Sequence, residues 1–369
     1  MVAFRIILAL VVGMAVLVAA SVGFVWFVRP LEPIRVEVVQ HGLDHPWDIA
    51  FADDGRMLVT ERIGRVLVYA SGDSEAELLS TATIPDVRAE LESGLMGMAV
   101  DGEAVFVCAS RDPGDAWRVQ LLRSTLADDG SLAPFEVVFI GEIIGAPRHQ
   151  GCAVEVDADE HLWLSVGDAN LPAGENRAQD PDRLNGKVLR LNLDGSVPSD
   201  NPFESAVYSL GHRNPQGIAF GPDGTTWAVE HGTDENDEIN RLQAGGNYGY
   251  PCFTGADGPG PIPDGCGVAS AYLQPAWASG TPTLATSGAT FMSGSGWGDW
   301  EGQLVVSTLK EEDLRRFSVG SDGSVTLEET LLDGRFGRLR AVVIGPDGAL
   351  YVSTSNGTDD RLLRVTRAE

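Results

Sequence analysis

The chain has few basic residues and few cysteines. It holds 26 Lys and Arg against 53 Asp and Glu, which gives a formal net charge of −27. Because phosphate binding needs a positive surface, this balance argues against nucleic acid as a partner and favours a soluble, salt-tolerant exterior. The four cysteines include no Cys-x-x-Cys pair, so a zinc or thioredoxin-like site has no support in the sequence.

The cysteines that are present fall into two pairs of different character. Cys252 and Cys266 border a loop rich in Gly and Pro, which has little else to fix it. A disulfide there would stabilise the fold by about 3 kcal/mol through the entropy of the unfolded chain, so we expect these two residues to be linked. Cys108 and Cys152 lie in strand-like runs and are predicted to be buried, small apolar side chains.

The N-terminus carries the longest apolar run of the sequence. The stretch 6–28 follows Arg5 and contains no charge, and it is long enough for a membrane-spanning helix, which needs roughly 20 residues. Small residues at 18–20 would suit signal cleavage, but the run continues beyond them, which favours an uncleaved anchor. We therefore predict a membrane anchor or signal segment at 1–30. The body, 31–369, is expected in the periplasm or outside the cell, and secreted if the segment is cleaved.

One sheet pattern recurs along the rest of the chain. An alternating apolar run is followed by a turn rich in Asp and Gly and by a second alternating run. The six copies begin near Asp48, Gly97, Cys152, Gly217, Ala289 and Ala341. This pattern predicts antiparallel hairpins, and their repetition predicts an all-β fold, a six-bladed β-propeller. Ile34 to Val39 is expected to pair with Leu362 to Thr366 and close the ring. A pair of β-sandwiches is the alternative, although it fits six repeats poorly.

Propeller ligands bind where the loops of several blades converge, so functional residues are expected in the loops between the units. His149 precedes the third unit, and Asp168 ends it. If the two flanking segments are adjacent antiparallel strands, these side chains lie at the same end of a hairpin. The carboxylate would then orient the imidazole as a general base. A purely structural histidine is the alternative.

Cations collect in two other places. The segment Gly211 to Gly217 packs His, Arg and two amides before a strand, which suits an anion or polar ligand, or else an arginine that ties two blades together. Lys310 ends a strand of the fifth unit, while Arg338 and Arg340 open the sixth on the same side of an extended chain. Three cations in so acidic a protein indicate a ligand with several carboxylates.

An oxygen-rich loop is the fourth unusual segment. It runs from Glu230 to Asn240 and is followed by the run Gly245 to Pro251. Such a loop suits calcium, through carboxylates or backbone carbonyls. It lacks the spacing of an EF-hand, so a solvated acidic turn is the alternative.

Together these residues resemble the PQQ-dependent sugar dehydrogenases, the glucose/sorbosone dehydrogenase group (PQQ is pyrroloquinoline quinone). The resemblance begins near Gly42 to Trp47 and continues to the C-terminus. It is carried by Gly94 to Gly97, the spacing of His149 and Asp168, Gly211 to Gly217, Asp237 to Asn240 with Gly245 to Pro251, and Arg338-x-Arg340.

This resemblance implies PQQ- and calcium-dependent oxidation of aldose sugars, with hydride transfer from the sugar C1 to the quinone. His149 would take the hydroxyl proton, and Asp168 would orient His149. Arg213, with calcium, would stabilise negative charge on the quinone oxygen. The carbonyls of Gly232 and Thr233 would hold the calcium. The residues that would contact the cofactor are Asn214, His231, Lys310, Arg338 and Arg340.

The sequence also departs from the family pattern. His231 and Thr233 stand where the best-known soluble glucose dehydrogenases have Gln and Pro. A backbone carbonyl does not depend on its side chain, so Thr233 should leave calcium binding intact, whereas His231 should alter cofactor contact and substrate preference. The acidic run Glu311 to Asp313 is expected to weaken cofactor affinity. Glu92 lies where the family places a polar residue near the substrate.

Two other kinds of protein share this architecture. A non-catalytic extracellular binding module would be expected to lack His149 or Arg213, and both are present. A calcium-dependent propeller lactonase needs side-chain carboxylates and Asn around an axial metal. The partners expected for the dehydrogenase are a small-molecule sugar, an unspecified electron acceptor and, through the N-terminal segment, the membrane.

Overall fold

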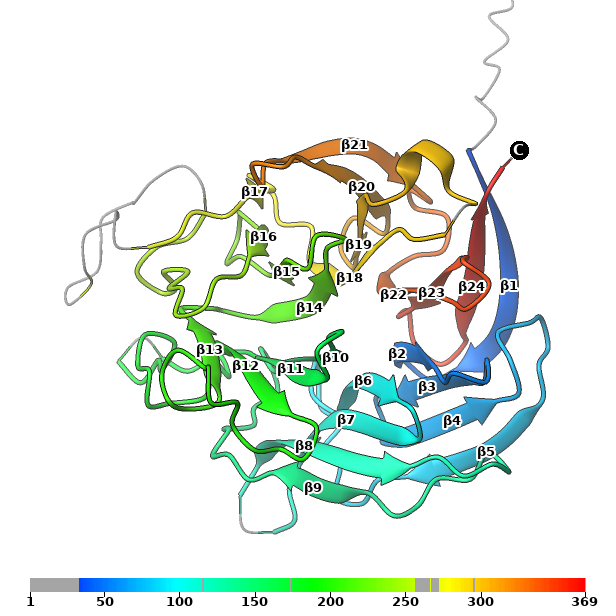
Figure 1. The fold of residues 1–369 in the computed structure, drawn as a ribbon, viewed down its shortest axis with the longest axis horizontal. Coiled ribbons are helices and arrows are strands. Elements are labelled where there is room, and N and C mark those ends of the chain that lie inside the picture. Colours follow the sequence, from blue (N-terminus) through cyan, green and yellow to red (C-terminus); the bar gives the residue numbers. More distant parts are fainter. Residues whose placement is uncertain are drawn as a thin grey trace, which may run out of the picture. The chain divides into compact units, whose positions relative to one another are not determined.

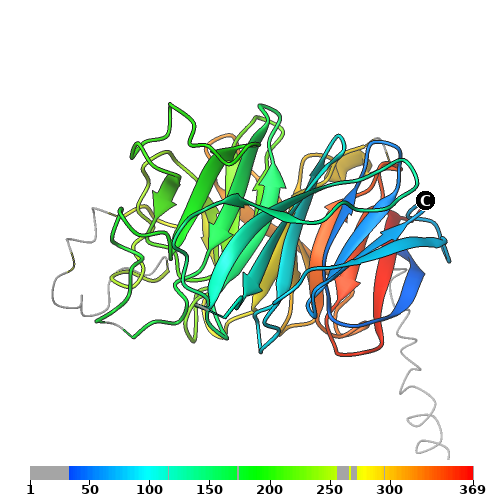
Figure 2. The same ribbon diagram turned by 90° about the horizontal axis from the view of Figure 1, so that it is seen from below.

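The chain folds into six four-stranded sheets arranged around one axis, with β2, β6, β10, β14, β18 and β22 innermost (Figure 1). This computed structural model describes residues 33–114, 116–172, 174–255, 266, 272–294 and 296–368. Seen from the side, the connecting loops project at both ends of the strands (Figure 2). The prediction of an all-β six-bladed propeller is confirmed, and the alternative of two β-sandwiches is wrong.

Neighbouring strands within each blade pair in antiparallel fashion. Blade 1 comprises β2 (Pro46–Phe51), β3 (Met57–Glu61), β4 (Arg65–Tyr69) and β5 (Leu78–Thr83). Blade 2 comprises β6 (Leu95–Asp101), β7 (Ala104–Arg111), β8 (Arg118–Thr125) and β9 (Glu136–Phe139). Blade 3 comprises β10 (Gly151–Val156), β11 (His161–Val166), β12 (Lys187–Asn192) and β13 (Val207–Leu210). Blade 4 comprises β14 (Pro215–Phe220), β15 (Thr226–Glu230), β16 (Glu238–Arg241) and β17 (Trp277–Ala278). Blade 5 comprises β18 (Thr286–Phe291), β19 (Leu304–Thr308), β20 (Leu314–Val319) and β21 (Val325–Leu331). Blade 6 comprises β22 (Leu339–Ile344), β23 (Leu350–Thr354), β24 (Asp360–Arg367) and β1 (Ile34–Leu43).

The repeated Asp-Gly turn has the same construction in three blades. Asp54, Asp223 and Asp347 each accept a hydrogen bond on Oδ1 from the backbone N–H two residues later, at 3.1, 3.2 and 3.1 Å. The glycine that follows each aspartate has a positive φ, for example +78° at Gly224, which glycine adopts without steric cost. The turn residues therefore fix where each inner strand ends and its hairpin returns.

The sixth blade joins the two ends of the propeller. Its outermost strand, β1, pairs with β24, and the register places Ile34 opposite Arg367 and Val38 opposite Leu363. The predicted closure by these segments is confirmed. Because both segments belong to one sheet, the ring has no open edge between its first and last blades.

The hydrophobic core lies between adjacent blades rather than within one sheet. Between blades 2 and 3, for example, Phe106 and Leu121 pack with Leu162, Leu164 and Leu189, all fully buried. Burial of each such side chain contributes about 1.5–3 kcal/mol. Each blade thus buries its apolar side chains against the next blade, and this packing fixes the blades relative to the axis.

Glycines let the inner strands of neighbouring blades approach closely. A Cβ on Gly97 would lie 2.2 Å from the carbonyl oxygen of Cys152, and one on Gly217 would lie 2.4 Å from that of Ser287. Any larger residue would push the blades apart at the axis. The glycines of these two motifs therefore have a packing role.

Both cysteine pairs are disulfides. Cys252 and Cys266 are linked as predicted. Cys108 and Cys152 are fully buried, but the prediction that they are unlinked apolar side chains is wrong, because they form a second disulfide. Cys108 lies in β7 and Cys152 in β10, so the bond joins blades 2 and 3 across a sequence separation of 44 residues.

Helical structure is sparse in the residues that the structure describes. One 3₁₀ helix, η2 (Gly298–Trp300), fills the turn between β18 and β19. No helix in the described part of the chain is long and apolar enough to cross a membrane. The predicted anchor or signal segment at 1–30 lies outside the described residues.

Candidate active site

His149 and Asp168 meet at one end of the β10–β11 hairpin. The two strands pair in antiparallel fashion, with Gly151 opposite Val166, as expected from the sequence. The imidazole Nδ1 lies 2.7 Å from Asp168 Oδ1, and since an ionised carboxylate can only accept, Nδ1 carries the proton. The ring nitrogen Nε2 is then left as a proton acceptor.

Asp168 is itself held rigidly. Its side chain is 1% exposed, and it accepts hydrogen bonds from Asn170 N at 2.8 Å and Asn176 Nδ2 at 2.9 Å. The backbone of His149 has a φ of +54°, an uncommon conformation for a residue with a side chain. Strain of this kind is often stored at functional sites, and here the network around Asp168 maintains it.

Glu92 lies against the backbone of His149. Its Oε2 accepts from His149 N at 3.0 Å and from Asn214 Nδ2 at 3.4 Å, while Oε1 is 3.4 Å from Arg148 Nη1. Burial opposes ionisation, but the His149 N–H and nearby positive charge hold the pKa of Glu92 below its ordinary value. The predicted substrate residue therefore places an ionised carboxylate beside the proposed base.

The segment before β14 brings Arg213 and Asn214 to the site around His149 and Glu92. Arg213 N donates to the buried carboxylate of Glu230 at 2.9 Å, and Arg213 Nη1 donates to the carbonyl of His231 at 3.3 Å. Arg213 Nε is buried and has no hydrogen-bond partner in the described structure. Asn214 is fully buried, and its Oδ1 accepts from Gly151 N at 3.0 Å. An orphaned guanidinium nitrogen is expensive unless a ligand completes it.

His231 is oriented from both sides of its ring. Nε2 lies 2.7 Å from the carbonyl of Thr286, so Nε2 carries the proton. Nδ1 lies 3.3 Å from Asn214 Nδ2 and accepts from it. Desolvation by burial lowers the pKa of His231, which favours this neutral ring.

The loop after β15 is organised around the carboxylate of Asp237. The buried carboxylate of Asp237 accepts from Gly232 N at 2.8 Å, Leu284 N at 2.5 Å and Ala285 N at 2.6 Å. A Cβ on Gly232 would lie 2.0 Å from the Glu235 carbonyl, so only glycine fits. The three backbone hydrogen bonds to the Asp237 carboxylate therefore fix the shape of this loop, and both oxygens of that carboxylate are already used as acceptors.

The oxygens available there match the donor set predicted for calcium. Among the described residues, no protein group donates a hydrogen bond to the carbonyls of Gly232 or Thr233. The same residues hold no group of three or more His, Cys, Asp or Glu side chains that could bind a metal. Calcium is often coordinated by backbone carbonyl oxygens. The carbonyls of Gly232 and Thr233 could therefore coordinate such an ion, with oxygen atoms of a bound ligand as its other ligands.

Lys310, Arg338 and Arg340, the three cations predicted to bind the cofactor carboxylates, are called the clamp below. Arg340 is the most buried of the three. Its guanidinium lies 3.6 Å from the centre of the Trp47 ring, and Nη1 donates to Gln216 Oε1 at 3.4 Å. Gln216 in turn donates to Asn214, which connects Arg340 to the site around His149. Burial, and then the charge of Arg338, lowers the pKa of Arg340 to about 9.

Arg338 and Lys310 lie beside each other at the exposed rim. Arg338 Nη1 donates to the carbonyl of Leu309 at 3.3 Å, and Lys310 Nζ donates to Thr283 Oγ1 at 3.2 Å. Neither these two cations nor Arg340 has a carboxylate within 4.0 Å among the described residues. Three cations without a carboxylate partner, in a chain of net charge −27, fit a ligand with several carboxylates, and PQQ is such a ligand.

Two further side chains reach the site without having been predicted. Tyr250 has its pKa raised to about 12, first by burial and then by the charge of Asp168, while Arg213 opposes the shift, so Tyr250 lies beside both. Arg62 Nη1 donates to the Leu91 carbonyl at 2.5 Å, and the charge of Arg62 reaches Arg340. Tyr250 belongs to the run Gly245 to Pro251, which the family resemblance includes. No motif in the sequence near Arg62 indicated a functional role for it.

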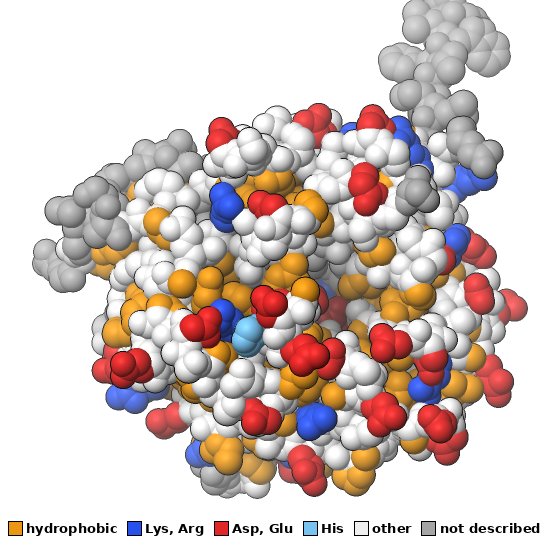
Figure 3. Space-filling view, in the orientation of Figure 1, with side chains coloured by type: hydrophobic (Ala, Val, Ile, Leu, Met, Phe, Trp, Pro, Cys, Tyr) orange, Lys and Arg blue, Asp and Glu red, His pale blue; other side chains and the backbone are white. Residues whose placement is uncertain are grey.

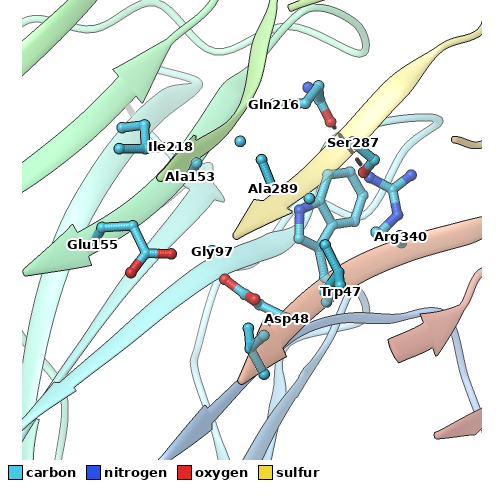
Figure 4. Close-up of a pocket in the computed structure, with 15 residues that line it drawn as sticks. Trp47, Asp48, Gly97, Ala153, Glu155, Gln216, Ile218, Ser287, Ala289 and Arg340 are labelled. Atoms are coloured by element: carbon cyan, nitrogen blue, oxygen red, sulfur yellow. Dashed lines mark hydrogen bonds between the residues drawn. The ribbon is translucent and has the colours of Figure 1, made fainter. Parts of the chain in front are cut away.

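Below this site the inner strands enclose a narrow axial cavity (Figure 4). Arg340 stacks on Trp47 at one side, while the carboxylates of Asp48 and Glu155 point toward each other at the other (Figure 4). Burial raises the pKa of Asp48 to about 7 and that of Glu155 well above its ordinary value. The face in Figure 3 is hollowed near its centre, with acidic, basic and histidine side chains around the hollow.

Comparison with known proteins gives one consistent family. The chain matches the family described as Glucose / Sorbosone dehydrogenase over residues 43–364. It is 32% identical over 360 residues to the aldose sugar dehydrogenase YliI of Escherichia coli (strain K12), covering 90% of this chain and 93% of the relative.

Solved structures give the same answer. The soluble aldose sugar dehydrogenase from Escherichia coli in the apo-form has a TM-score of 0.81 at 33% identity, over 91% of this chain and 100% of that chain. The PQQ-bound aldose sugar dehydrogenase from Streptomyces coelicolor has a TM-score of 0.75 at 27% identity, over 91% and 99%. The resemblance found in the sequence is thus confirmed, and this chain belongs to the glucose/sorbosone dehydrogenase family.

Proposed function

We propose that this chain is a PQQ- and calcium-dependent dehydrogenase that oxidises aldose sugars. The observation that carries the proposal is the convergence of an oriented histidine with cations that have no carboxylate partner among the described residues. His149 is held by Asp168 at 2.7 Å, and Arg213 Nε is buried without a partner in the described structure. Relatives named aldose sugar dehydrogenase, one of them PQQ-bound, support the same activity.

The residues divide into groups with different tasks. His149 accepts the proton of the sugar hydroxyl on Nε2, because Nδ1 is committed to Asp168. Arg213 would stabilise negative charge that develops next to its guanidinium, whose Nε has no partner in the described structure. Bound PQQ would supply the hydride acceptor, and bound calcium an electrophile at the quinone oxygens.

The remaining residues hold and orient. The carbonyls of Gly232 and Thr233 are the proposed protein ligands of calcium. Asn214 and His231 position the polar edge of the cofactor through their shared hydrogen bond at 3.3 Å. The cations proposed to bind the cofactor carboxylates are Lys310, Arg338 and Arg340.

We also propose that the protein works outside the cytoplasm. Two disulfides, Cys108–Cys152 and Cys252–Cys266, are typical of oxidising compartments. Residues 1–30 would hold the propeller at the membrane with its body periplasmic or extracellular. Fractionation and protease accessibility test this placement. A soluble mature protein that begins near Ser21 would indicate a cleaved signal and a secreted enzyme.

A titration with PQQ in the presence of calcium tests the activity. We expect a change in quinone absorbance on binding and reduction of an electron-accepting dye when aldoses are added. Chelation should abolish dye reduction and leave the far-UV circular dichroism nearly unchanged, because blade packing and disulfides hold the fold. Full activity in a metal-free preparation would contradict the role of Gly232 and Thr233.

A further inference from the structure

Glu92 is an anion that the rest of the proposed mechanism does not use. It lies in the loop between β5 and β6, and its own N–H donates to the carbonyl of Pro147 at 2.9 Å. Its carboxylate returns to the same segment by accepting from His149 N at 3.0 Å. These two bonds in opposite directions fix the carboxylate beside the residue proposed to take the substrate proton.

The charge of Glu92 is only weakly balanced. Its one ion-pair partner among the described residues is Arg148, whose nearest nitrogen is 3.4 Å away and whose side chain is 55% exposed. An exposed pair of this length contributes little and leaves much of the negative charge in place. By contrast, Asp168 is buried, and the hydrogen bonds of His149, Asn170 and Asn176 satisfy its carboxylate.

Glu92 is also within reach of a ligand. Its side chain is 29% exposed, and the two hydrogen bonds to Oε2 leave Oε1 with the long contact to Arg148 alone. Arg340 acts on this charge only from beyond ion-pair distance, and Arg338 and Arg340 are both assigned to the cofactor carboxylates. A substrate seated against His149 therefore meets a carboxylate whose one ion-pair partner among the described residues is the exposed Arg148.

From this geometry we propose that Glu92 selects aldoses that carry a protonated amine, such as 2-amino-2-deoxy sugars, over their neutral and acidic counterparts. The inference rests on the proposed dehydrogenase activity and adds its substrate class. An ammonium group can donate a charge-assisted hydrogen bond to Oε1, which is stronger than one from a neutral hydroxyl. A uronate would instead bring a second carboxylate toward Glu92 and be disfavoured.

The test compares sugars of similar shape and different charge. For the enzyme loaded with PQQ and calcium, kcat/KM is measured for glucosamine, N-acetylglucosamine and glucuronate, at a pH where the amine is protonated. We expect glucosamine to be the best of the three substrates. In Glu92→Gln, the ratio of glucosamine to N-acetylglucosamine should fall about tenfold, as expected for loss of one half-buried charge pair. Glutamine keeps an oxygen for the His149 N–H, so this variant retains the loop geometry.

Two further variants give the test a direction and a control. Arg148→Gln removes the weak partner of Glu92 and should raise the same ratio about twofold to threefold. Glu136→Gln makes the same charge change on β9, an outer strand, and should leave the ratio unchanged. An unaltered ratio in Glu92→Gln, or the same fall in Glu136→Gln, would overturn the proposal.

Equilibrium binding separates this proposal from the activity on which it rests. Calorimetry with 1,5-anhydroglucosamine and 1,5-anhydroglucitol, which lack the oxidisable anomeric hydroxyl, should show tighter binding of the amine to wild type and not to Glu92→Gln. Equal affinity for both analogues in wild type would refute the selection while glucose oxidation stands. Failure to bind PQQ or to oxidise any aldose would instead reject the proposed function, and this inference with it.

Discussion

Replacement of His149 by alanine tests the proposed chemistry most directly. Because the imidazole Nδ1 is 2.7 Å from Asp168 Oδ1, Nε2 is the one ring nitrogen left to take a substrate proton. A positioned general base contributes about 10²–10⁴-fold to a rate. We therefore expect His149→Ala to lower kcat on glucose by about that factor. Its affinity for PQQ should survive, because the cofactor contacts are assigned to other side chains.

Two measurements separate these effects, and a second histidine provides the control. Dye-coupled turnover gives kcat, and an absorbance titration gives the dissociation constant of PQQ. His161 lies on the same hairpin at the far end of β11, where its ring is 3.4 Å from Asp157. His161→Ala makes the same chemical change away from the site and should leave kcat unchanged.

The pH dependence of turnover adds an independent test. The wild-type rate should fall in acid, because a protonated imidazole cannot accept the hydroxyl proton. Asp168→Asn should lower kcat, since an amide no longer fixes the tautomer of His149. If His149→Ala still oxidises aldoses at a near-native rate, the assignment of the base is wrong, and the proposal is reduced to a propeller that binds PQQ.

Three other predictions follow from contacts described above. Arg340→Ala should weaken PQQ binding while turnover is partly restored at high cofactor concentration; normal affinity would remove Arg340 from the clamp. The double variant Cys108→Ser with Cys152→Ser should lose about 4 kcal/mol in the free energy of unfolding, measured by denaturant titration, as expected for a loop of this length; an unchanged midpoint would contradict this. Asp48 keeps a proton in the folded state up to a pKa of about 7, whereas its ordinary value is 3.8, so stability should decline as the pH rises between these values. Asp48→Asn should flatten that decline, and an equal slope in both proteins would show that the group does not titrate there.

The fold was predictable because it repeats. Each Asp-Gly turn with its two alternating runs marks one blade, and six such marks fix the number of blades. The pairing of β1 with β24 was predicted from the strand propensity of the two segments alone, and the structure confirms it. Local signals of turn and alternation therefore carried the architecture.

The contacts between blades were beyond the reach of those local signals. Cys108 and Cys152 each look like an apolar residue of a strand, and only the approach of β7 to β10 makes them a disulfide. Likewise, alternation placed Arg338 and Arg340 on one side but did not reveal that Arg340 is buried against Trp47 while Arg338 is exposed. These properties depend on which blades face each other, and no short stretch of sequence contains that information.

The candidate site shows the same division. The hydrogen bond of His149 and Asp168 was predicted because both residues flank one hairpin. Arg62 was missed because it belongs to no chemical motif. Tyr250 lies in the run Gly245 to Pro251, but nothing in that run assigned a role to its side chain. The roles of the predicted residues came from family resemblance. The geometry connects Asp168, His149, Glu92, Asn214, Gln216 and Arg340 through successive hydrogen bonds.

The closure of the ring by β1 and β24 has a consequence for the order in which the fold is completed during synthesis. Strand β1, Ile34–Leu43, leaves the ribosome before the other described strands, whereas its partner β24, Asp360–Arg367, follows them all. Until β24 has emerged, β1 has no partner in its sheet, and its edges are open to aggregation. Ribosome-bound chains that stop before Asp360 should therefore be cut by protease more readily than chains that include β24.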